Sequence, residues 1–152
     1  MKVLFVCTGN TCRSVMAEAI FNNINTNEDV CAISAGISIV PNSKASENSV
    51  IILKKNMNVD INNRKAIQLT KEMVEDADLI LTMTFYIKDV LMTYFPKYSE
   101  KIFALNEYIG QDEDIIDPYG GNIDVYSKTF FELKNKILLL MYKIKEDKSI
   151  FE

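Results

Sequence analysis

Four short apolar runs separated by segments of helical spacing most constrain the fold of this chain. The runs cover residues 2–7, 30–35, 77–83 and 101–105. Such alternation is typical of a parallel sheet covered by helices on both faces. Because 152 residues suffice for one domain of ordinary size, we expect a single α/β domain over 1–152 with a four-stranded parallel sheet.

Apolar side chains recur at helical spacing between and after these runs. Met16, Ile20 and Ile24 share one face of the first such segment. Further helices are expected over 44–56, in a short segment capped by Thr70 and over 85–94, with irregular chain over 58–66. The last helix carries the longest apolar stripe, which we expect to pack on the sheet: Tyr126, Phe130, Leu133, Ile137, Leu140 and Ile144.

Composition excludes several functional classes. With 17 basic and 21 acidic residues the net charge is -4, which argues against a nucleic-acid partner. The apolar run after Lys2 is too short for a signal peptide or membrane span, so we expect a cytoplasmic protein without a membrane partner. The chain has no histidine, which excludes Cys-His and Ser-His-Asp catalysis, and its three cysteines cannot build a four-thiolate zinc site. We therefore expect no metal and no cofactor.

A polar loop joins the first apolar run to the first expected helix. Its backbone N–H groups and the helix N-terminus would together favour a phosphate dianion. An arginine in the loop can grip two phosphate oxygens, and the same positive field favours the nucleophilic thiolate of a cysteine. We therefore expect a phosphate site with Cys7 as nucleophile, formed by Cys7, Thr8, Gly9, Asn10, Thr11, Cys12, Arg13 and Ser14.

A second loop follows the fourth run and contains Asp117-Pro118-Tyr119-Gly120-Gly121. The carboxyl ends of parallel strands meet at one rim, so this loop should lie near the phosphate loop. Phosphoryl transfer to a thiolate needs a proton for the leaving group, and Asp117 is our candidate for the general acid. Pro118 would stiffen the loop and Tyr119 would form a wall of the pocket. Taken by itself, this segment is a favourable turn sequence that needs no catalytic role, and the phosphate loop is what favours catalysis.

These motifs resemble the low-molecular-weight protein-tyrosine phosphatases, whose mark is an N-terminal Cys-x5-Arg-Ser loop and an Asp-Pro-Tyr-like loop near the C-terminus. The resemblance spans essentially the whole chain, including Ser34-Ala35-Gly36. It implies that Cys7 attacks phosphorus, Arg13 holds the equatorial oxygens and Asp117 is the acid. It also implies that Asn10, Ser14 and Ser34 support the loop, with Asn10 left-handed and the thiolate stabilised by hydrogen bonds.

Details within the family resemble the bacterial protein-arginine phosphatases. That branch has Thr at the position of Thr11, where tyrosine-specific members usually carry an aliphatic residue. It also has an Asp-Pro-aromatic-Gly-Gly loop, matched by 117–121, followed by an Ile-Asp-aliphatic-Tyr run, matched by 123–126. At the position after Arg-Ser, where the family commonly has Pro, this chain has Val15. A Pro there favours the first turn of the helix, but the reaction does not require it. Thr11 would offer a hydroxyl to a guanidinium and Tyr119 would stack on it, so we expect phosphoarginine in proteins as substrate. A difference of one methyl discriminates only about 10- to 200-fold, which keeps phosphotyrosine as the alternative.

The sequence supports other functions less well. Thioredoxin-coupled arsenate reductases share the fold and first loop but use two further cysteines after the third strand, where 82–98 contains none. A phosphate-binding module without activity would need neither Cys7 nor Asp117. The resemblance implies a reversible Cys7–Cys12 disulfide, although Cys12 could equally serve packing, and Cys31 is expected in the core. The partners expected are phosphorylated proteins, and the protein is expected to be a monomer.

Overall fold

The four expected strands form one parallel sheet. The computed structural model describes residues 1–151, with side-chain surroundings for residues 1–148. The strands run in the order β2-β1-β3-β4, and the sheet confirms the expected fold class. Their bounds are β1 Lys2–Cys7, β2 Cys31–Gly36, β3 Leu79–Thr82 and β4 Ile102–Ala104. The third and fourth strands are shorter than their apolar runs, because the outer residues of those runs belong to turns and to a helix.

Helices connect the strands and follow the sheet. Their bounds are α1 Arg13–Ile24, α2 Glu47–Met57, α3 Lys71–Asp76, α4 Phe85–Tyr94, η1 Pro96–Lys101 (a 3-10 helix), α5 Leu105–Tyr108 and α6 Ile123–Phe151. The expected helices are all present, and α4 has the bounds expected from the sequence. The short η1 and α5 were not expected, because one turn or two carry too little periodicity to be recognised.

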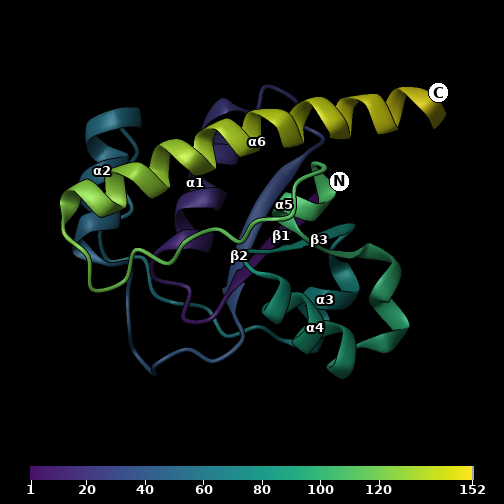
Figure 1. The fold of residues 1–152 in the computed structure, drawn as a ribbon, viewed down its shortest axis with the longest axis horizontal. Helices are drawn as coiled ribbons and strands as arrows, with labels where there is room; N and C mark the ends of the chain where they lie inside the picture. The colour runs from purple at the N-terminus through teal and green to yellow at the C-terminus, as the bar shows by residue number, and fades with distance from the viewer. Residues whose placement is uncertain (152) are drawn as a thin grey trace.

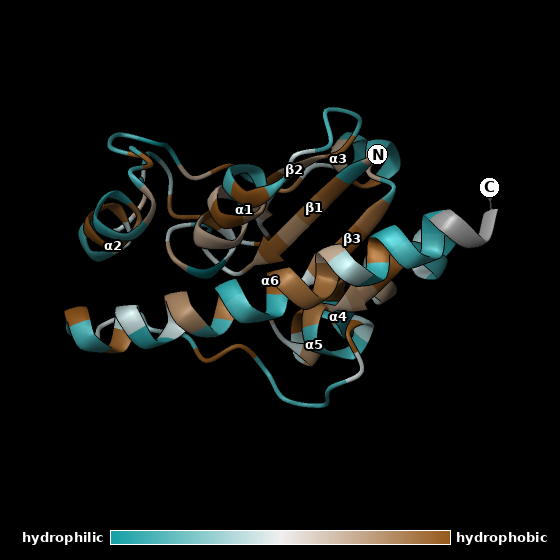
Figure 2. Ribbon diagram, turned by 90° about the horizontal axis from the view of Figure 1, so that it is seen from above, coloured by the Kyte–Doolittle hydropathy of each residue, from teal (hydrophilic) through white to brown (hydrophobic). Residues whose placement is uncertain are grey.

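The sheet has two apolar faces, each covered by its own helices (Figure 1). Alternate residues of β1 point to opposite faces. Val3 and Phe5 pack in the larger cluster with residues of α1 and α6, whereas Leu4 and Val6 pack in the smaller one with residues of α3 and α4. Figure 2 shows β1 and β3 as the most hydrophobic strands in the middle of the structure. The central strand is thus fixed from both sides.

The apolar stripe of α6 lies against the sheet as expected. Phe130, Leu133, Ile137 and Leu140 are fully buried in the larger cluster. Each buried apolar side chain of this size contributes about 1.5–3 kcal/mol to folding relative to an exposed one. The stripe therefore secures both α6 and the loop before it.

Two sequence expectations are wrong in detail. The second helix begins at Glu47 rather than at residue 44, because Lys44 forms an antiparallel bridge with Lys65 and Ser46 caps the helix by accepting a hydrogen bond from Ser49 N–H. Cys31, expected in the core, is exposed. It is the first residue of the edge strand β2, where only β1 pairs with it, and the neighbouring Ala32 takes the buried position.

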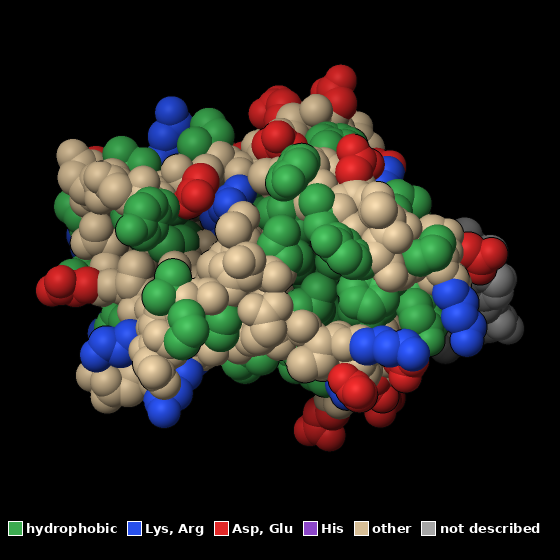
Figure 3. Space-filling view, turned by 90° about the horizontal axis from the view of Figure 1, so that it is seen from below, with side chains coloured by type: hydrophobic (Ala, Val, Ile, Leu, Met, Phe, Trp, Pro, Cys, Tyr) green, Lys and Arg blue, Asp and Glu red, His purple; other side chains and the backbone are tan. Residues whose placement is uncertain are grey.

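The face opposite α6 is mixed in character (Figure 3). Hydrophobic side chains gather in its middle, while Lys and Arg are scattered among Asp and Glu around them. Among the described residues, none of the helices combines the length and apolarity needed to cross a bilayer.

Strand order determines where a ligand can bind. From β1 the chain moves to β2 on one side and then crosses to β3 on the other, so the direction of winding reverses at β1. In open α/β sheets, ligands bind beyond the carboxyl ends of the strands at such a reversal. The loop that leaves β1 at Cys7 lies at this point.

Candidate functional site

The loop after β1 forms the wall of a cleft of about 540 Å³. Cys12 occupies the N-cap position of α1 and its side chain does not cap the helix, so the first backbone N–H groups of α1 remain available. The lining residues are Cys7, Thr8, Gly9, Asn10, Thr11, Cys12, Arg13, Ser38, Val40, Ser43, Lys44, Ser46, Asp117 and Tyr119. Nearly all of the predicted site residues therefore line one cleft; Ser14 and Ser34 lie behind it.

Cys7 is buried at the end of β1 and surrounded by hydrogen-bonding groups. Its Sγ lies 2.8 Å from Ser14 Oγ, and Asn10 donates its backbone N–H to the sulfur at 3.2 Å. Both groups can donate to a sulfur anion, and donors of this kind stabilise a thiolate. The arrangement is suited to an ionised nucleophile.

Asn10 organises the loop from behind. Its φ of 55° lies in the left-handed region, as expected from the sequence. Its Nδ2 donates to Ser14 Oγ at 2.8 Å and to Ser34 Oγ at 3.0 Å, and both serines are fully buried. The side chain of Asn10 therefore joins the loop to α1 and to β2.

Gly36, at the end of β2, permits a close approach of the loop. A Cβ at this position would lie 2.6 Å from the backbone oxygen of Thr8 and 3.1 Å from the backbone nitrogen of Asn10. Ile37 and Ser38 donate their backbone N–H groups to the carbonyl oxygens of Cys7 and Thr8, both at 3.0 Å. Only glycine leaves room for this packing.

Arg64 belongs to this network, although nothing in the sequence around it predicts this role. Its Nη1 donates to Asn10 Oδ1 at 2.8 Å and its Nη2 donates to Ser34 Oγ at 2.9 Å. Its Nε lies 3.3 Å from a carboxylate oxygen of Glu18 on α1. Arg64 lies in the segment expected to be irregular, where periodicity gives no signal, so only tertiary structure reveals its position.

Arg13 connects the phosphate loop to the acidic loop. Its Nη1 donates to the backbone oxygen of Ile115 at 3.1 Å, and its Nη2 lies 3.5 Å from the Asp117 carboxylate. The Arg13 side chain is 7% exposed, whereas that of Asp117 is 53% exposed. The guanidinium is therefore held in a fixed orientation, and the carboxylate is open to the cleft.

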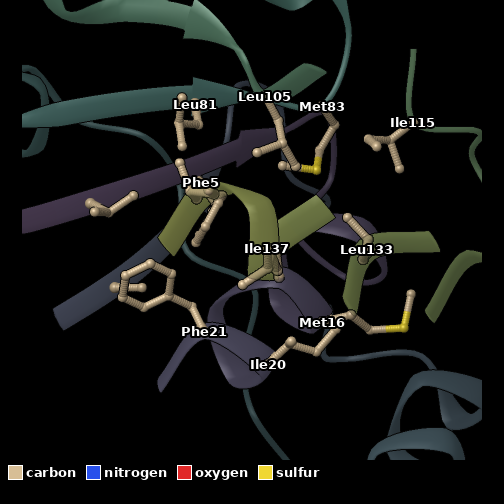
Figure 4. Packing of buried hydrophobic residues seen from close by; sticks show 14 of the residues in the cluster. Phe5, Met16, Ile20, Phe21, Leu81, Met83, Leu105, Ile115, Leu133 and Ile137 are labelled. Carbon is tan, nitrogen blue, oxygen red and sulfur yellow. The ribbon is translucent and has the colours of Figure 1, made fainter. Parts of the chain in front are cut away.

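The acidic loop is anchored by Ile115. This residue is buried in the larger core cluster, and Figure 4 shows its side chain on the same side of that cluster as Met83 and Leu133. Its backbone N–H donates to Met83 O at 3.0 Å. Asp117 is held two residues further along, where Tyr119 N–H donates to Asp117 Oδ1 at 3.0 Å.

Cys12 lies at the other side of the loop, next to α6. Its Sγ lies 3.1 Å from Tyr126 Oη and 3.5 Å from Ser46 Oγ. Burial, reinforced by the hydrogen bond to Cys12, raises the pKa of Tyr126 to about 12. Cys7 and Cys12 are both free thiols in this structure.

The two residues predicted to set specificity line the cleft in different ways. Thr11 is half-buried, and its backbone oxygen accepts hydrogen bonds from Ser46 N–H and Ser49 Oγ at the start of α2. Tyr119 is 79% exposed, so its ring stands at the mouth. Within the described part of the chain, no group of three or more Cys, Asp or Glu side chains is arranged to hold a metal ion.

Comparison with known proteins agrees with this geometry. The sequence model of the family described as "Low molecular weight phosphotyrosine protein phosphatase" matches residues 2–150. A protein-arginine-phosphatase from Bacillus subtilis is 41% identical, covering 97% of this chain and 99% of that protein. The low molecular weight protein-tyrosine-phosphatase PtpB from Staphylococcus epidermidis is 37% identical, covering 95% of this chain and 97% of that protein.

A solved structure has the same fold. It is the arginine phosphatase YwlE, in a cysteine-to-serine mutant with a phosphorylated active-site serine. It superposes with a TM-score of 0.91 at 40% identity, covering 98% of this chain and 99% of that one. With the family matched over nearly the whole chain, the protein belongs to the low-molecular-weight phosphotyrosine protein phosphatases and is a cysteine-dependent phosphatase.

Proposed function

We propose that this protein hydrolyses phosphoarginine in proteins through a phosphocysteine intermediate. In the first step the Cys7 thiolate attacks phosphorus and the bond from phosphorus to the guanidinium nitrogen breaks. Arg13 and the backbone N–H groups of residues 8–14 hold the equatorial oxygens, whose charge they stabilise through the transition state. Asp117 gives its proton to the leaving nitrogen.

In the second step Asp117 acts as a base. It takes a proton from a water molecule, whose oxygen attacks phosphorus and breaks the bond to Cys7 Sγ. Inorganic phosphate and the thiolate are released, so the enzyme returns to its starting state. The 53% exposure of Asp117 beside buried Arg13 supports both roles, since the carboxylate can meet the leaving group and then water.

The substrate preference rests on Thr11 in the cleft wall between Cys7 and the start of α2. The Thr11 hydroxyl and the unprotonated oxygen of the Asp117 carboxyl group can accept hydrogen bonds from the N–H groups of a guanidinium, whereas a phenol ring has no such N–H groups. Tyr119 at the mouth would stack on the planar guanidinium. Relatives named protein-arginine-phosphatase, which match nearly the full chain, support this preference.

The remaining features of the proposal concern setting and regulation. Residues 1–152 would form one domain that acts as a monomer in the cytoplasm on phosphorylated proteins, without metal or cofactor. Oxidation would join Cys7 to Cys12 and reversibly remove the nucleophile. The burial of both thiols at the two sides of one loop is compatible with such a pair.

A paired assay tests the substrate. Turnover of a phosphoarginine peptide and a phosphotyrosine peptide of otherwise identical sequence is compared at matched concentrations. We expect the higher kcat/KM for phosphoarginine. A clear preference for phosphotyrosine would instead establish a tyrosine phosphatase with the same chemistry.

A further inference from the structure

Arg64 and Glu18 form a half-buried ion pair directly behind the phosphate loop. The two side chains are 17% and 20% exposed. Burial raises the pKa of Glu18, although the neighbouring Arg64 and Ser34 partly oppose this effect. Neither residue lines the cleft, so neither is placed to touch the substrate.

The Arg64 guanidinium and a backbone N–H together fix the orientation of the Asn10 amide. Arginine has donors and no acceptor, so the Asn10 atom facing Nη1 must be the carbonyl oxygen. Ile67 also donates its backbone N–H to this oxygen, at 2.9 Å. The amide nitrogen must therefore face the opposite way, toward Ser14 and Ser34.

This orientation has a consequence at the sulfur. Ser14 Oγ accepts a hydrogen bond from Asn10 Nδ2, so the one hydroxyl hydrogen of Ser14 remains for Cys7 Sγ, 2.8 Å away. With the amide reversed, Ser14 would donate to the oxygen of Asn10 and would have no hydrogen for the thiolate. A hydrogen bond to a charged group is about twice as strong as a neutral one, so its direction matters for the nucleophile.

We propose that Arg64, held by Glu18, is a positioning residue that acts with the Ile67 N–H to set the direction of the hydrogen bonds behind the loop, so that Ser14 donates to the Cys7 thiolate. The inference rests on the proposed role of Cys7 as nucleophile. The other ionisable groups that line the cleft with the sulfur are Cys12, Arg13, Lys44, Asp117 and Tyr119, whereas the contacts of Arg64 are with Asn10, Ser34, Lys65 and Glu18.

The test compares Arg64→Met with a matched control. Lys88 pairs with Glu107 on α5, its side chain is also 17% exposed, and it lies outside the cleft, so Lys88→Met breaks a similar ion pair elsewhere. Alkylation of Cys7 by iodoacetamide is followed by mass spectrometry of the Cys7 peptide at about pH 6 and about pH 9, on either side of most of the titration range of thiols. The kcat and KM for p-nitrophenyl phosphate are measured alongside.

We expect Arg64→Met to lower both kcat and the ratio of the alkylation rate at low pH to that at high pH about tenfold, the effect of losing one hydrogen bond to a charged group. KM should change much less than kcat. Lys88→Met should match the wild type in both measurements, even if both variants melt at lower temperature. A wild-type alkylation ratio in folded Arg64→Met would overturn the proposal.

Arg64→Lys provides the test if the Met variant does not fold. One ammonium nitrogen cannot replace donors that reach Asn10, Ser34 and Glu18 from three separate positions, so the ratio should fall here as well. An unchanged ratio in Arg64→Lys would contradict the proposed role. Because alkylation reports on the sulfur without turnover, these outcomes are independent of whether phosphoarginine is the substrate.

Discussion

Arg13 Nη2 lies 3.5 Å from the carboxylate of Asp117, which joins the first residue of α1 to the loop before α6. Nη1 of the same guanidinium donates to the backbone oxygen of Ile115. One side chain thus positions both the phosphate loop and the proposed acid. Phosphate chemistry at this site therefore depends on the loop before α6 as well as on the loop after β1.

Replacing the acid should affect poor leaving groups most. We expect Asp117→Asn to lower kcat about 100-fold or more for a phosphoarginine peptide, because the departing nitrogen needs a proton. The loss should be much smaller for formation of the intermediate from p-nitrophenyl phosphate, whose leaving group departs without protonation. Pre-steady-state release of nitrophenol measures this step.

Asp112→Asn is the matched control, because Asp112 is an exposed carboxylate of the same loop that does not line the cleft. It should leave both rates unchanged. An equal loss for both substrates in Asp117→Asn would show that this carboxylate does not act as the acid.

Changing Thr11 should alter the choice of substrate. Thr11→Ile removes the hydroxyl and adds apolar surface to the cleft wall, so the ratio of kcat/KM for phosphoarginine to that for phosphotyrosine should fall about 10-fold or more. The ratio is measured with the paired peptides. Thr8→Val, at an exposed position of the same loop, should change it much less. If Thr11→Ile leaves the ratio as in the wild type, Thr11 has no part in specificity.

The buried phenol of Tyr126 makes stability sensitive to high pH. Its pKa is raised from 10.0 to about 12, so the folded state holds this proton more tightly than the unfolded state does. The corresponding stabilisation is present below pH 10 and is lost as the pH rises toward 12. We expect Tyr126→Phe to flatten the fall in the free energy of unfolding over this range, measured by urea denaturation.

Tyr108, whose pKa is also raised by burial and by its hydrogen bond to Asp147, remains in that variant, so part of the fall should persist. Identical slopes for Tyr126→Phe and the wild type would contradict the role given to Tyr126.

The apolar stripe of α6 should contribute strongly to stability. Leu133 is fully buried, and we expect Leu133→Ala to cost about 2–5 kcal/mol, since the cavity left behind closes only in part. Leu138 lies on the same helix and is 40% exposed, so Leu138→Ala should cost less than about 1 kcal/mol. Chemical denaturation measures both, and equal losses would mean that the stripe is not the packed face.

The sequence predicted the parts of the site that depend on neighbours along the chain. The apolar run, the loop and the amphipathic segment after it are contiguous, so strand, phosphate loop and α1 could be recognised together. Asp117 could also be placed, because parallel strands bring their carboxyl ends to one rim. These inferences needed only periodicity and topology.

Other features depend on contacts between distant segments. Arg64 reaches Asn10 from an irregular segment, and Ile115 is buried beside Met83 although it follows three acidic residues. The apolar neighbours Val30 and Ala32 predict that Cys31 is a core residue, but its position at the start of an edge strand exposes it. Neither periodicity nor composition contains this information.

The mechanism is tested most directly by finding whether Cys7 carries the phosphoryl group. Asp117→Asn, which should also slow hydrolysis of the intermediate, is mixed with p-nitrophenyl phosphate, whose leaving group departs without protonation, then quenched in acid and digested for mass spectrometry. We predict one phosphoryl group on the Cys7 peptide, and none on the corresponding peptide of Cys7→Ala/Asp117→Asn, which has no nucleophile at position 7. Turnover by Cys7→Ala at the wild-type rate, or the absence of a phosphoryl group from the Cys7 peptide of Asp117→Asn, would contradict the mechanism.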